Sequence, residues 1–263
     1  MPGKLAGGID VGSCTTKAVI VDSEGNILGS RVIYSGTDFQ DAANRAWGYA
    51  VEEARLSSTD SITVFSTGYG RNSVGFSSKS LTEISCHARG CLHYFSGPMT
   101  IVDIGGQDNK IIKLDKNGLR VSFKMNRKCA AGTGAFLEEM ALRLRLPIEK
   151  LNELAQNANG EVTLGSYCTV FSGTEVLEKI KSGAPVDSIV RGLFHSVVKR
   201  ILEMDTLTDT IVMTGGVVEY NPFLVDLLRT HIPNEIVTPP HPQIMGALGA
   251  ALHALHDAVK DAD

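Results

Sequence analysis

Two segments of the chain carry the same residues that could bind a nucleotide phosphate. The shared set is an aspartate, a glycine two positions later and a lysine, and it recurs after 93 residues as Asp10, Gly12, Lys17 and Asp103, Gly105, Lys110. Glycine-containing turns expose backbone N–H groups that bind phosphate, and a nearby carboxylate can hold Mg²⁺ through water. Each copy therefore predicts a phosphate-binding turn, with Asp10 and Asp103 placed to hold the metal ion.

The longer segments around these residues, 9–22 and 102–115, repeat in register, and each reads as a β-hairpin. Gly12, Gly105 and Gly106 supply the backbone freedom that such tight turns need. An internal repeat of this kind predicts two related half-domains that face one another across a cleft. The alternative is two unrelated hairpins with acidic turns, which a single copy would favour but a matched pair does not.

A third segment, 211–217, predicts a strand that gives way to a helix at Gly215 and Gly216. Two glycines at such a point let a ligand lie against the backbone, and adenosine would fit there. The last predicted helix starts near Gln243 and is rich in glycine and alanine. Its small residues predict either a hinge between the lobes or a closely packed helix with no hinge role.

Cys129 and Cys168 are each expected just before a helix. The N-terminus of a helix carries partial positive charge and N–H donors, so it favours a thiolate that can bind a metal. Two thiolates per chain are half of a four-thiolate site, and a two-fold homodimer would supply the other half. Four thiolates suit either a [4Fe–4S] cluster or a zinc ion.

The other cysteines are less specific. Cys86, His87, Cys91 and His93 lie close together, but their spacing places them on different faces of a predicted helix. A zinc site there competes with structural or surface roles, which the usual burial of free cysteine favours. An odd total of five cysteines argues against a disulfide framework.

Hydrophobic periodicity and turn residues predict the elements that must position these side chains. Strands are predicted at 5–12, 16–22, 27–34, 61–66, 209–214 and 235–238, with a second hairpin set at 99–124. Helices are predicted at 39–56, 81–95, 131–145, 147–158, 173–182, 185–206, 221–231 and 243–258. We therefore expect an α/β protein with a first lobe at 1–97 and a second at 98–263. The closing helix, 243–263, could also pack back on the first lobe.

Composition excludes several classes of partner. A length of 263 residues with 43% hydrophobic content allows a large core, and the net charge of −4 creates no field that attracts nucleic acid. The N-terminal segment has no charged and apolar leader, and the apolar runs are too short for a bilayer. We expect a cytoplasmic protein that binds neither nucleic acid nor membrane.

The two phosphate hairpins, the Thr214-Gly215-Gly216 turn and the final helix resemble the superfamily of acetate and sugar kinases, heat-shock chaperones and actin. This resemblance covers nearly the whole chain. It implies two ribonuclease H-like lobes with ATP and Mg²⁺ in an actin-like ATPase cleft.

The cysteine segments resemble a narrower family. Cys-Ala-Ala-Gly-Thr-Gly at 129–134 and Cys-Thr-Val-Phe at 168–171 are similar to the activators of 2-hydroxyacyl-CoA dehydratases and to the ATPase subunits of benzoyl-CoA reductases. The resemblance implies a homodimer bridged by one [4Fe–4S] cluster. It also implies that hydrolysis of ATP to ADP drives one-electron transfer to a dehydratase, or to a related acyl-CoA reductase, with ferredoxin or flavodoxin as donor.

The same resemblance implies roles for individual residues. Cys129 and Cys168 become the cluster ligands, and Gln107 orients the attacking water near the γ-phosphate. The first phosphate loop is Ser13, Cys14, Thr15, Thr16 and Lys17, and the adenosine side is Gly215, Gly216 and Gln243. Gly173, predicted in the first turn of a helix, stands where many relatives are expected to carry an acidic residue. That departure leaves the subgroup, and so the partner enzyme, open.

Two alternatives remain at this point. A small-molecule kinase, such as an N-acetylhexosamine kinase, would use Asp103 or Asp108 as its base. A nucleotide-switched scaffold would bind ATP without iron. In the favoured interpretation, the bound nucleotide selects one lobe arrangement over another and so controls exposure of the cluster.

Overall fold

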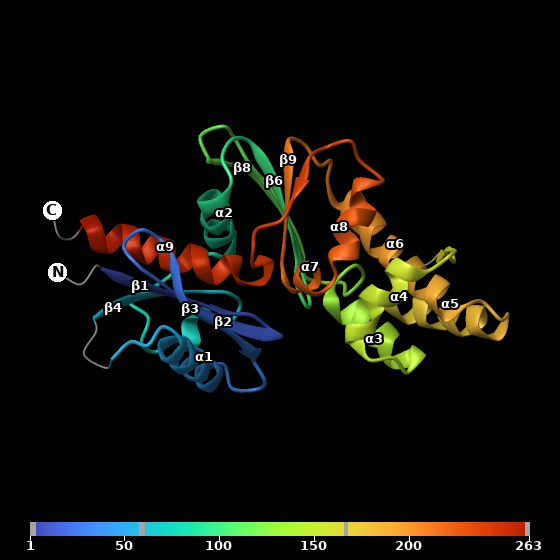
Figure 1. The fold of residues 1–263 in the computed structure, drawn as a ribbon, viewed down its shortest axis with the longest axis horizontal. Coiled ribbons are helices and arrows are strands. Elements are labelled where there is room, and N and C mark those ends of the chain that lie inside the picture. Colours follow the sequence, from blue (N-terminus) through green and yellow to red (C-terminus); the bar gives the residue numbers. More distant parts are fainter. Residues whose placement is uncertain (1–3, 58–60, 166–167, 261–263) are drawn as a thin grey trace. The chain divides into compact units, whose positions relative to one another are not determined.

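The computed structural model describes residues 4–57, 61–165 and 168–260. The chain divides into two compact units, the first formed by residues 1–96 with 244–263 and the second by residues 97–243. Each unit is an α/β structure built on a mixed five-stranded sheet (Figure 1). No helix within the described ranges is both long and apolar enough to cross a membrane.

The sheet of the first unit has the order β3-β2-β1-β4-β5. Its strands are β1 (Leu5–Val11), β2 (Thr15–Val21), β3 (Ile27–Tyr34), β4 (Ile62–Thr67) and β5 (Lys79–Ser80). The first three strands form an antiparallel meander, whereas β4 and β5 join in parallel on the other side of β1. In the first hairpin, Asp10 is the register partner of Lys17.

The sheet of the second unit repeats this topology, with the order β10-β9-β6-β7-β8. Its strands are β6 (Met99–Ile104), β7 (Asn109–Leu114), β8 (Arg120–Asn126), β9 (Thr210–Thr214) and β10 (Ile236–Val237). Here β6, β7 and β8 form the antiparallel meander and β9 lies parallel to β6. Asp103 is the register partner of Lys110, so the sequence repeat is also a structural repeat.

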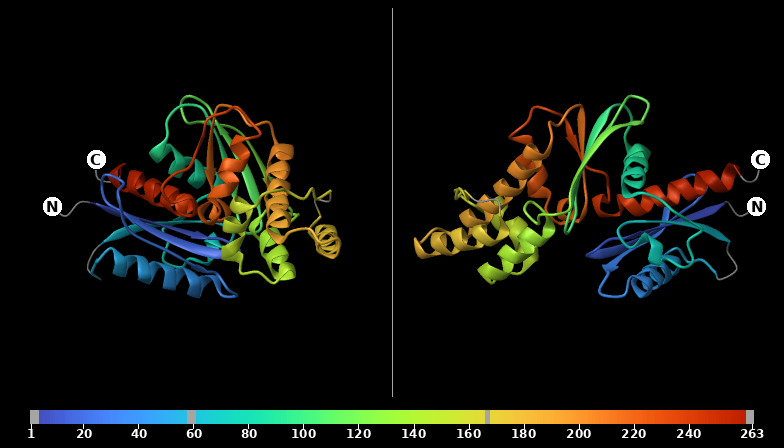
Figure 2. Two further views of the ribbon diagram at one scale, coloured as in Figure 1. Left: turned by 45° about the vertical axis from the view of Figure 1, so that its right-hand side comes forward. Right: turned by 180° about the vertical axis from the view of Figure 1, so that it is seen from behind.

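Helices cover both faces of the first sheet (Figures 1 and 2). Helix α1 (Phe39–Glu53) lies on one face and α9 (Met245–Lys260) on the other, and α2 (Glu83–Tyr94) packs against α9. The 3₁₀ turn η1 spans Arg71–Ser73. The alanines of α1 pack with alternate residues of β1, including Ile9 and Val11, in one hydrophobic cluster. Gly8, which precedes Ile9, lies on the other face of β1 and faces α9, because a Cβ atom there would lie 2.0 Å from the carbonyl oxygen of Ala247.

Close packing explains the small residues of α9. Added Cβ atoms would lie 1.7 Å from the Cys86 carbonyl at Gly249 and 2.3 Å from the Met245 carbonyl at Gly90. The backbones of α2 and α9 therefore touch, which side chains at these positions would prevent. The predicted close packing of the final helix is confirmed.

The second unit carries the larger group of helices. They are α3 (Gly134–Leu144), α4 (Leu151–Asn157), α5 (Thr169–Lys181), α6 (Val186–Met204), α7 (Gly216–Tyr220) and α8 (Pro222–Arg229). Two 3₁₀ turns accompany them, η2 (Ile148–Lys150) and η3 (Pro242–Ile244). The last residue of η3, Ile244, is where the chain returns to the first unit. The predicted apolar stripe of α6 is buried from Ile189 to Ile201 and packs with Val102, Ile104 and Phe136. This core fixes α3 and α6 against the strands that carry the second phosphate hairpin.

Several predicted boundaries are wrong. Helix α3 begins at Gly134 rather than 131, because Gly132 has a φ of +79° and Thr133 is the extended N-cap. Helix α5 begins at Thr169 rather than 173, and α1 ends at Glu53, just before Arg55 with its left-handed φ of +55°. Pro147 is the N-cap of a 3₁₀ turn, not a first-turn residue. The short strand β5 was not predicted, and the helix expected after Gly215 and Gly216 is divided into α7 and α8 at Asn221.

Candidate nucleotide and thiolate sites

The first phosphate hairpin has a tightly bonded turn. The backbone N–H of Gly12 donates to the carbonyl of Thr15 at 3.0 Å, and the hydroxyl of Ser35 donates to the carbonyl of Gly12 at 2.7 Å. Ser35 also bonds the hydroxyl of Thr16 at 2.9 Å, and its N–H donates to the carbonyl of Cys14. The turn from Gly12 to Thr15 is thereby fixed by the segment that follows β3.

The second phosphate hairpin closes its turn in the same way. The N–H of Gly105 donates to the carbonyl of Asp108 at 2.9 Å, and Gln107 between them is exposed. In both hairpins a Cβ atom on the turn glycine, Gly12 or Gly105, would come within 2.8 Å of a side-chain or backbone oxygen. The turns therefore need glycine because a side chain would clash there, and not for the backbone freedom that was predicted, since Gly12, Gly105 and Gly106 all lack a positive φ.

The two aspartates have different surroundings. Asp103 is buried, and its carboxylate accepts from Lys110 Nζ at 3.2 Å and from Thr214 Oγ1 at 3.2 Å. Lys110 Nζ also donates to Asp108 Oδ1 at 2.9 Å. The equivalent ammonium group of Lys17 lies 3.6 Å from Asp10 Oδ2. Asp103 thus ties β6 to β7 and β9, whereas Asp10 is held by a longer ion pair.

The predicted adenosine residues lie together at the end of β9. Gly215 has a φ of +99°, and its N–H donates to the carbonyl of Pro242 at 2.9 Å. A Cβ atom on Gly216 would lie 3.1 Å from Gln243 Nε2. The N–H of Gln243 donates to Glu219 Oε2 at 3.1 Å, which joins the turn to α7.

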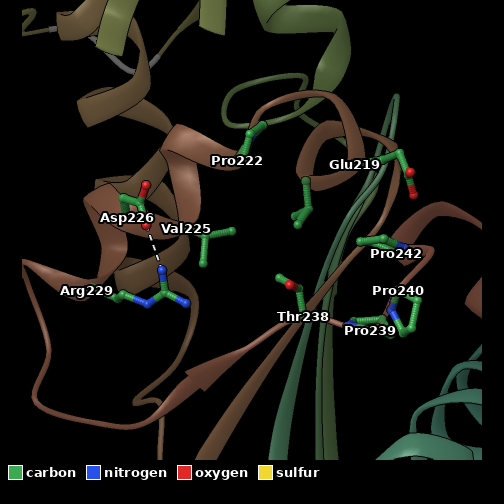
Figure 3. Close-up of a pocket in the computed structure, with 10 residues that line it drawn as sticks. Glu219, Pro222, Val225, Asp226, Arg229, Thr238, Pro239, Pro240 and Pro242 are labelled. Carbon is green, nitrogen blue, oxygen red and sulfur yellow. Dashed lines mark hydrogen bonds and ion pairs between the residues drawn. The ribbon is translucent and has the colours of Figure 1, made fainter.

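A pocket of about 260 Å³ lies beside this turn, between α7, α8 and the segment after β10 (Figure 3). Its lining residues are Val218, Glu219, Pro222, Val225, Asp226, Arg229, Thr238, Pro239, Pro240 and Pro242. Arg229 forms a 2.6 Å ion pair with Asp226 on its wall. None of these residues was predicted as a site residue. The proline run after the last short strand was the one signal in the sequence that could have marked it.

The cysteines of the second unit occupy two different settings. Cys129 is half-buried in the loop after β8, and Asn126 Nδ2 donates to its carbonyl at 3.0 Å. Residues 130–133 separate it from α3, so the prediction that it stands just before a helix is wrong. Cys168 is exposed and is the N-cap residue of α5, closer to a helix than predicted. Ser166 and Tyr167, which belong to its sequence segment, lie outside the described residues.

Gly173 was predicted in the first turn of a helix, but it lies one turn inside α5. A Cβ atom there would lie 2.5 Å from Arg143 Nε on α3. Arg143 also donates to Glu139 on its own helix at 2.8 Å. The glycine therefore lets the arginine side chain of α3 lie against α5.

Comparison with known proteins identifies the family. The model of the BadF/BadG/BcrA/BcrD ATPase family matches residues 8–254. The chain belongs to this family. It is 39% identical over 254 residues to the 2-hydroxyisocaproyl-CoA dehydratase activator of Clostridioides difficile, covering 95% of both chains.

Solved structures agree with this relationship. The activator of the 2-hydroxyisocaproyl-CoA dehydratase from Clostridium difficile with bound ADPNP matches at a TM-score of 0.91 and 38% identity, over 98% of this chain and 97% of that one. Component A of the Acidaminococcus fermentans (R)-2-hydroxyglutaryl-CoA dehydratase matches at a TM-score of 0.92 and 36% identity, over 97% and 99%. The chain is thus an ATPase with the fold of these activators.

In this member of the ATPase family, the two Asp–Lys pairs allow a matched test. Lys110→Met is expected to lower the free energy of unfolding by about 3–5 kcal/mol, because it leaves the buried carboxylate of Asp103 without its charge partner. Lys17→Met should cost less, about 1–2 kcal/mol, since its ion pair is longer and its side chain more exposed. Urea unfolding of both variants measures the difference, and an equal loss would contradict it.

The histidines and cysteines of α2 lie in different environments. Cys86 and Cys91 are fully buried, His87 is nearly so, and His93 is exposed with its ring 4.9 Å from that of Tyr94. Within the described ranges, no three His, Cys, Asp or Glu side chains are grouped to hold a metal ion. No disulfide links the five cysteines, all of which lie in those ranges.

Burial raises the pKa of the Cys86 thiol from its ordinary value of 9.0 to about 12. The pKa of this thiol is higher in the folded state than in the unfolded state. Its contribution to the free energy of unfolding is therefore complete below pH 9.0 and is lost as the pH rises toward 12. We therefore expect iodoacetamide at pH 8 to modify Cys168 in the folded, iron-free protein but not Cys86. Peptide mass spectrometry checks this, with urea-unfolded protein as the control in which both react.

Proposed function

We propose that this ATPase activates a 2-hydroxyacyl-CoA dehydratase by ATP-dependent, one-electron transfer. The observation that supports this most strongly is the full-length similarity, at 39% identity, to a protein named as such an activator. The Cys129–Gly134 segment and Cys168 add a pair of thiols in the same unit as the second phosphate hairpin. Ferredoxin or flavodoxin is the proposed electron donor.

We propose that Cys129 and Cys168 of two chains hold one [4Fe–4S] cluster. The donor set fits, because both side chains are reduced thiols with accessible surface, and two chains supply the four thiolates that the cluster needs. Val170, Phe171 and Leu177 on α5 are 67%, 65% and 51% exposed, close in sequence to Cys168. A second copy of the chain would cover such an apolar face. When bound, the cluster supplies the one-electron redox chemistry.

The proposed nucleotide contacts follow the geometry of each unit. The phosphates are assigned to the two turns, and Mg²⁺ is assigned to Asp10 and Asp103 through its water shell. The turn residues are Gly12, Ser13, Cys14, Thr15, Thr16 and Lys17 in the first unit and Gly105, Gly106 and Gln107 in the second. Gln107 has the exposed amide needed to orient a water molecule. Gly215, Gly216 and Gln243 are assigned to adenosine, beside the pocket of α7 and α8.

ATP hydrolysis is proposed to act by gating. A nucleotide can shift a conformational equilibrium only by binding one state better than the other. ATP would favour a state in which the thiol-bearing loops present the redox centre to the partner. Hydrolysis would then reset the protein and make the transfer irreversible.

The kinase alternative fits the side chains less well. A kinase base must accept a proton from its substrate hydroxyl. Asp103 and Asp108, the two candidates, are both ion-paired to the buried Lys110. Because each carboxylate is paired with the same ammonium group, neither is available to accept a proton as a general base.

Reconstitution tests the proposal. The protein, reduced without oxygen, is mixed with a purified 2-hydroxyacyl-CoA dehydratase and its substrate, and enoyl-CoA formation is measured with ATP and with ADP. Product that requires both ATP and this protein is the expected result. If the protein instead supported reduction of an aromatic acyl-CoA by a benzoyl-CoA reductase, it would be an ATPase subunit of that reductase type and not a dehydratase activator. Phosphorylation of N-acetylglucosamine, with no electron transfer, would contradict the proposal.

A further inference from the structure

The loop at residues 127–133, here called the Cys129 loop, is fastened by two asparagines of the β7–β8 hairpin. Asn126 Nδ2 donates to the carbonyl of Cys129 at 3.0 Å, and Asn109 Nδ2 donates to the carbonyl of Gly132 at 2.8 Å. The two asparagines are register partners across β7 and β8. The hairpin therefore holds the loop at the cysteine and again three residues later.

The start of α3 is bonded to the phosphate turn between β6 and β7, which Asn109 directly follows. The N–H of Gly134 donates to the carbonyl of Gly105 at 3.0 Å, and that of Ala135 donates to the carbonyl of Gly106 at 2.7 Å. These carbonyls belong to the turn that carries Gln107. A shift of the turn toward or away from a phosphate would thus act directly on the end of the Cys129 loop.

The first unit shows the same arrangement, except that its segment after β3 carries no cysteine. Thr16 and Gly12 are the repeat equivalents of Asn109 and Gly105, and both bond Ser35, which follows β3 as the Cys129 loop follows β8. In each unit, the segment after the third strand fastens the phosphate turn. In the second unit that segment has become the thiol-bearing loop.

The C-terminal end of the loop, residues 131–133, is buried and has little room to move independently. Asn109 is 1% exposed and Thr133 is fully buried. A Cβ atom on Gly132 would lie 2.9 Å from Arg200 Cγ on α6, so the backbone lies directly against that side chain. Tightly packed segments of this kind transmit displacements and do not absorb them.

We propose that Asn109 and Asn126 are positioning residues that make the placement of Cys129 follow the Gly105–Gln107 turn. The thiol would then be more accessible with one nucleotide at the turn than with another. This inference rests on the proposed function for the role of the turn in phosphate binding. It does not require that the protein hold iron.

Alkylation of the iron-free protein tests this inference. The rate of iodoacetamide modification at Cys129 is measured by peptide mass spectrometry with ADP and with the non-hydrolysable analogue ADPNP. In the wild type we expect the two rates to differ about fivefold or more, the lower range of typical coupling between sites. In Asn109→Ala and Asn126→Ala the ratio should fall close to one, while both variants still bind ADP.

Asn234→Ala is the matched control. Its Nδ2 donates to the carbonyl of Asp209 at 3.0 Å, a bond of the same kind in the same unit. This variant should keep the wild-type ratio. If Asn109→Ala does not fold, Asn126→Ala decides, because its side chain is only half-buried. Equal rates in the wild type, or a ratio preserved in a folded asparagine variant, would overturn the inference.

The two proposals can fail separately. Protein that holds no iron after anaerobic purification, yet shows the nucleotide-dependent rate and its loss in the variants, would refute the cluster and leave the coupling intact. Protein that holds iron when purified without oxygen, but whose iron-free form is alkylated at a nucleotide-independent rate, would do the reverse.

Discussion

Cys129→Ala and Cys168→Ala are each expected to abolish iron binding completely. The proposed cluster needs four thiolates from two chains, and either substitution removes two of the four at once. Iron content after anaerobic reconstitution should fall from about four atoms per two chains to near zero in both variants. The visible absorption of the cluster should disappear in parallel.

Cys91→Ala provides the control for this result. Cys91 is a fully buried thiol of α2, in the other unit from the two proposed ligands. Its substitution should lower stability through lost packing and leave iron content unchanged. Retention of full iron content in either Cys129→Ala or Cys168→Ala would show that the ligands were assigned wrongly.

Gly249→Ala is expected to destabilise the first unit by several kcal/mol. The added methyl group would lie 1.7 Å from the carbonyl oxygen of Cys86, where backbone on both sides leaves no side chain to move. Overpacking of this kind typically costs about 1–3 kcal/mol, and a backbone clash lies at or beyond the upper end. Urea unfolding of the whole chain measures the loss.

Gly48→Ala, the same substitution at an exposed position, should raise the free energy of unfolding and not lower it. Gly48 is exposed on α1, and an added Cβ atom would meet nothing within 4 Å. Replacing glycine by alanine inside an exposed helix stabilises by about 0.5–1 kcal/mol. If both glycine variants changed stability equally, the close contact between α2 and α9 would be contradicted.

The repeat was the most informative part of the sequence. The constant spacing between Asp10 and Asp103 predicts two hairpins with equivalent registers, and the structure confirms both pairings with their lysines. Spacing alone could not show how the pairs differ. Lys110 has a second carboxylate in Asp108, and Asp103 has Thr214 as a further partner 111 residues away.

Local errors had tertiary causes. The prediction that Cys129 stands just before a helix depends on a helix that starts at 131, whereas α3 starts at Gly134. The left-handed Gly132 delays α3, and the bonds from α3 to Gly105 and Gly106 set where it begins. Gly173 was also predicted near the start of a helix, but it is glycine because the Arg143 side chain lies against α5 at this point. Such contacts between distant segments leave no periodic signal in the sequence.

The most direct test of the central claim is the iron content and mass of the protein purified without oxygen. Native mass spectrometry and iron analysis of one sample should give two chains with about four iron atoms and a brown colour. A colourless monomer that contains no iron and still hydrolyses ATP would contradict the account.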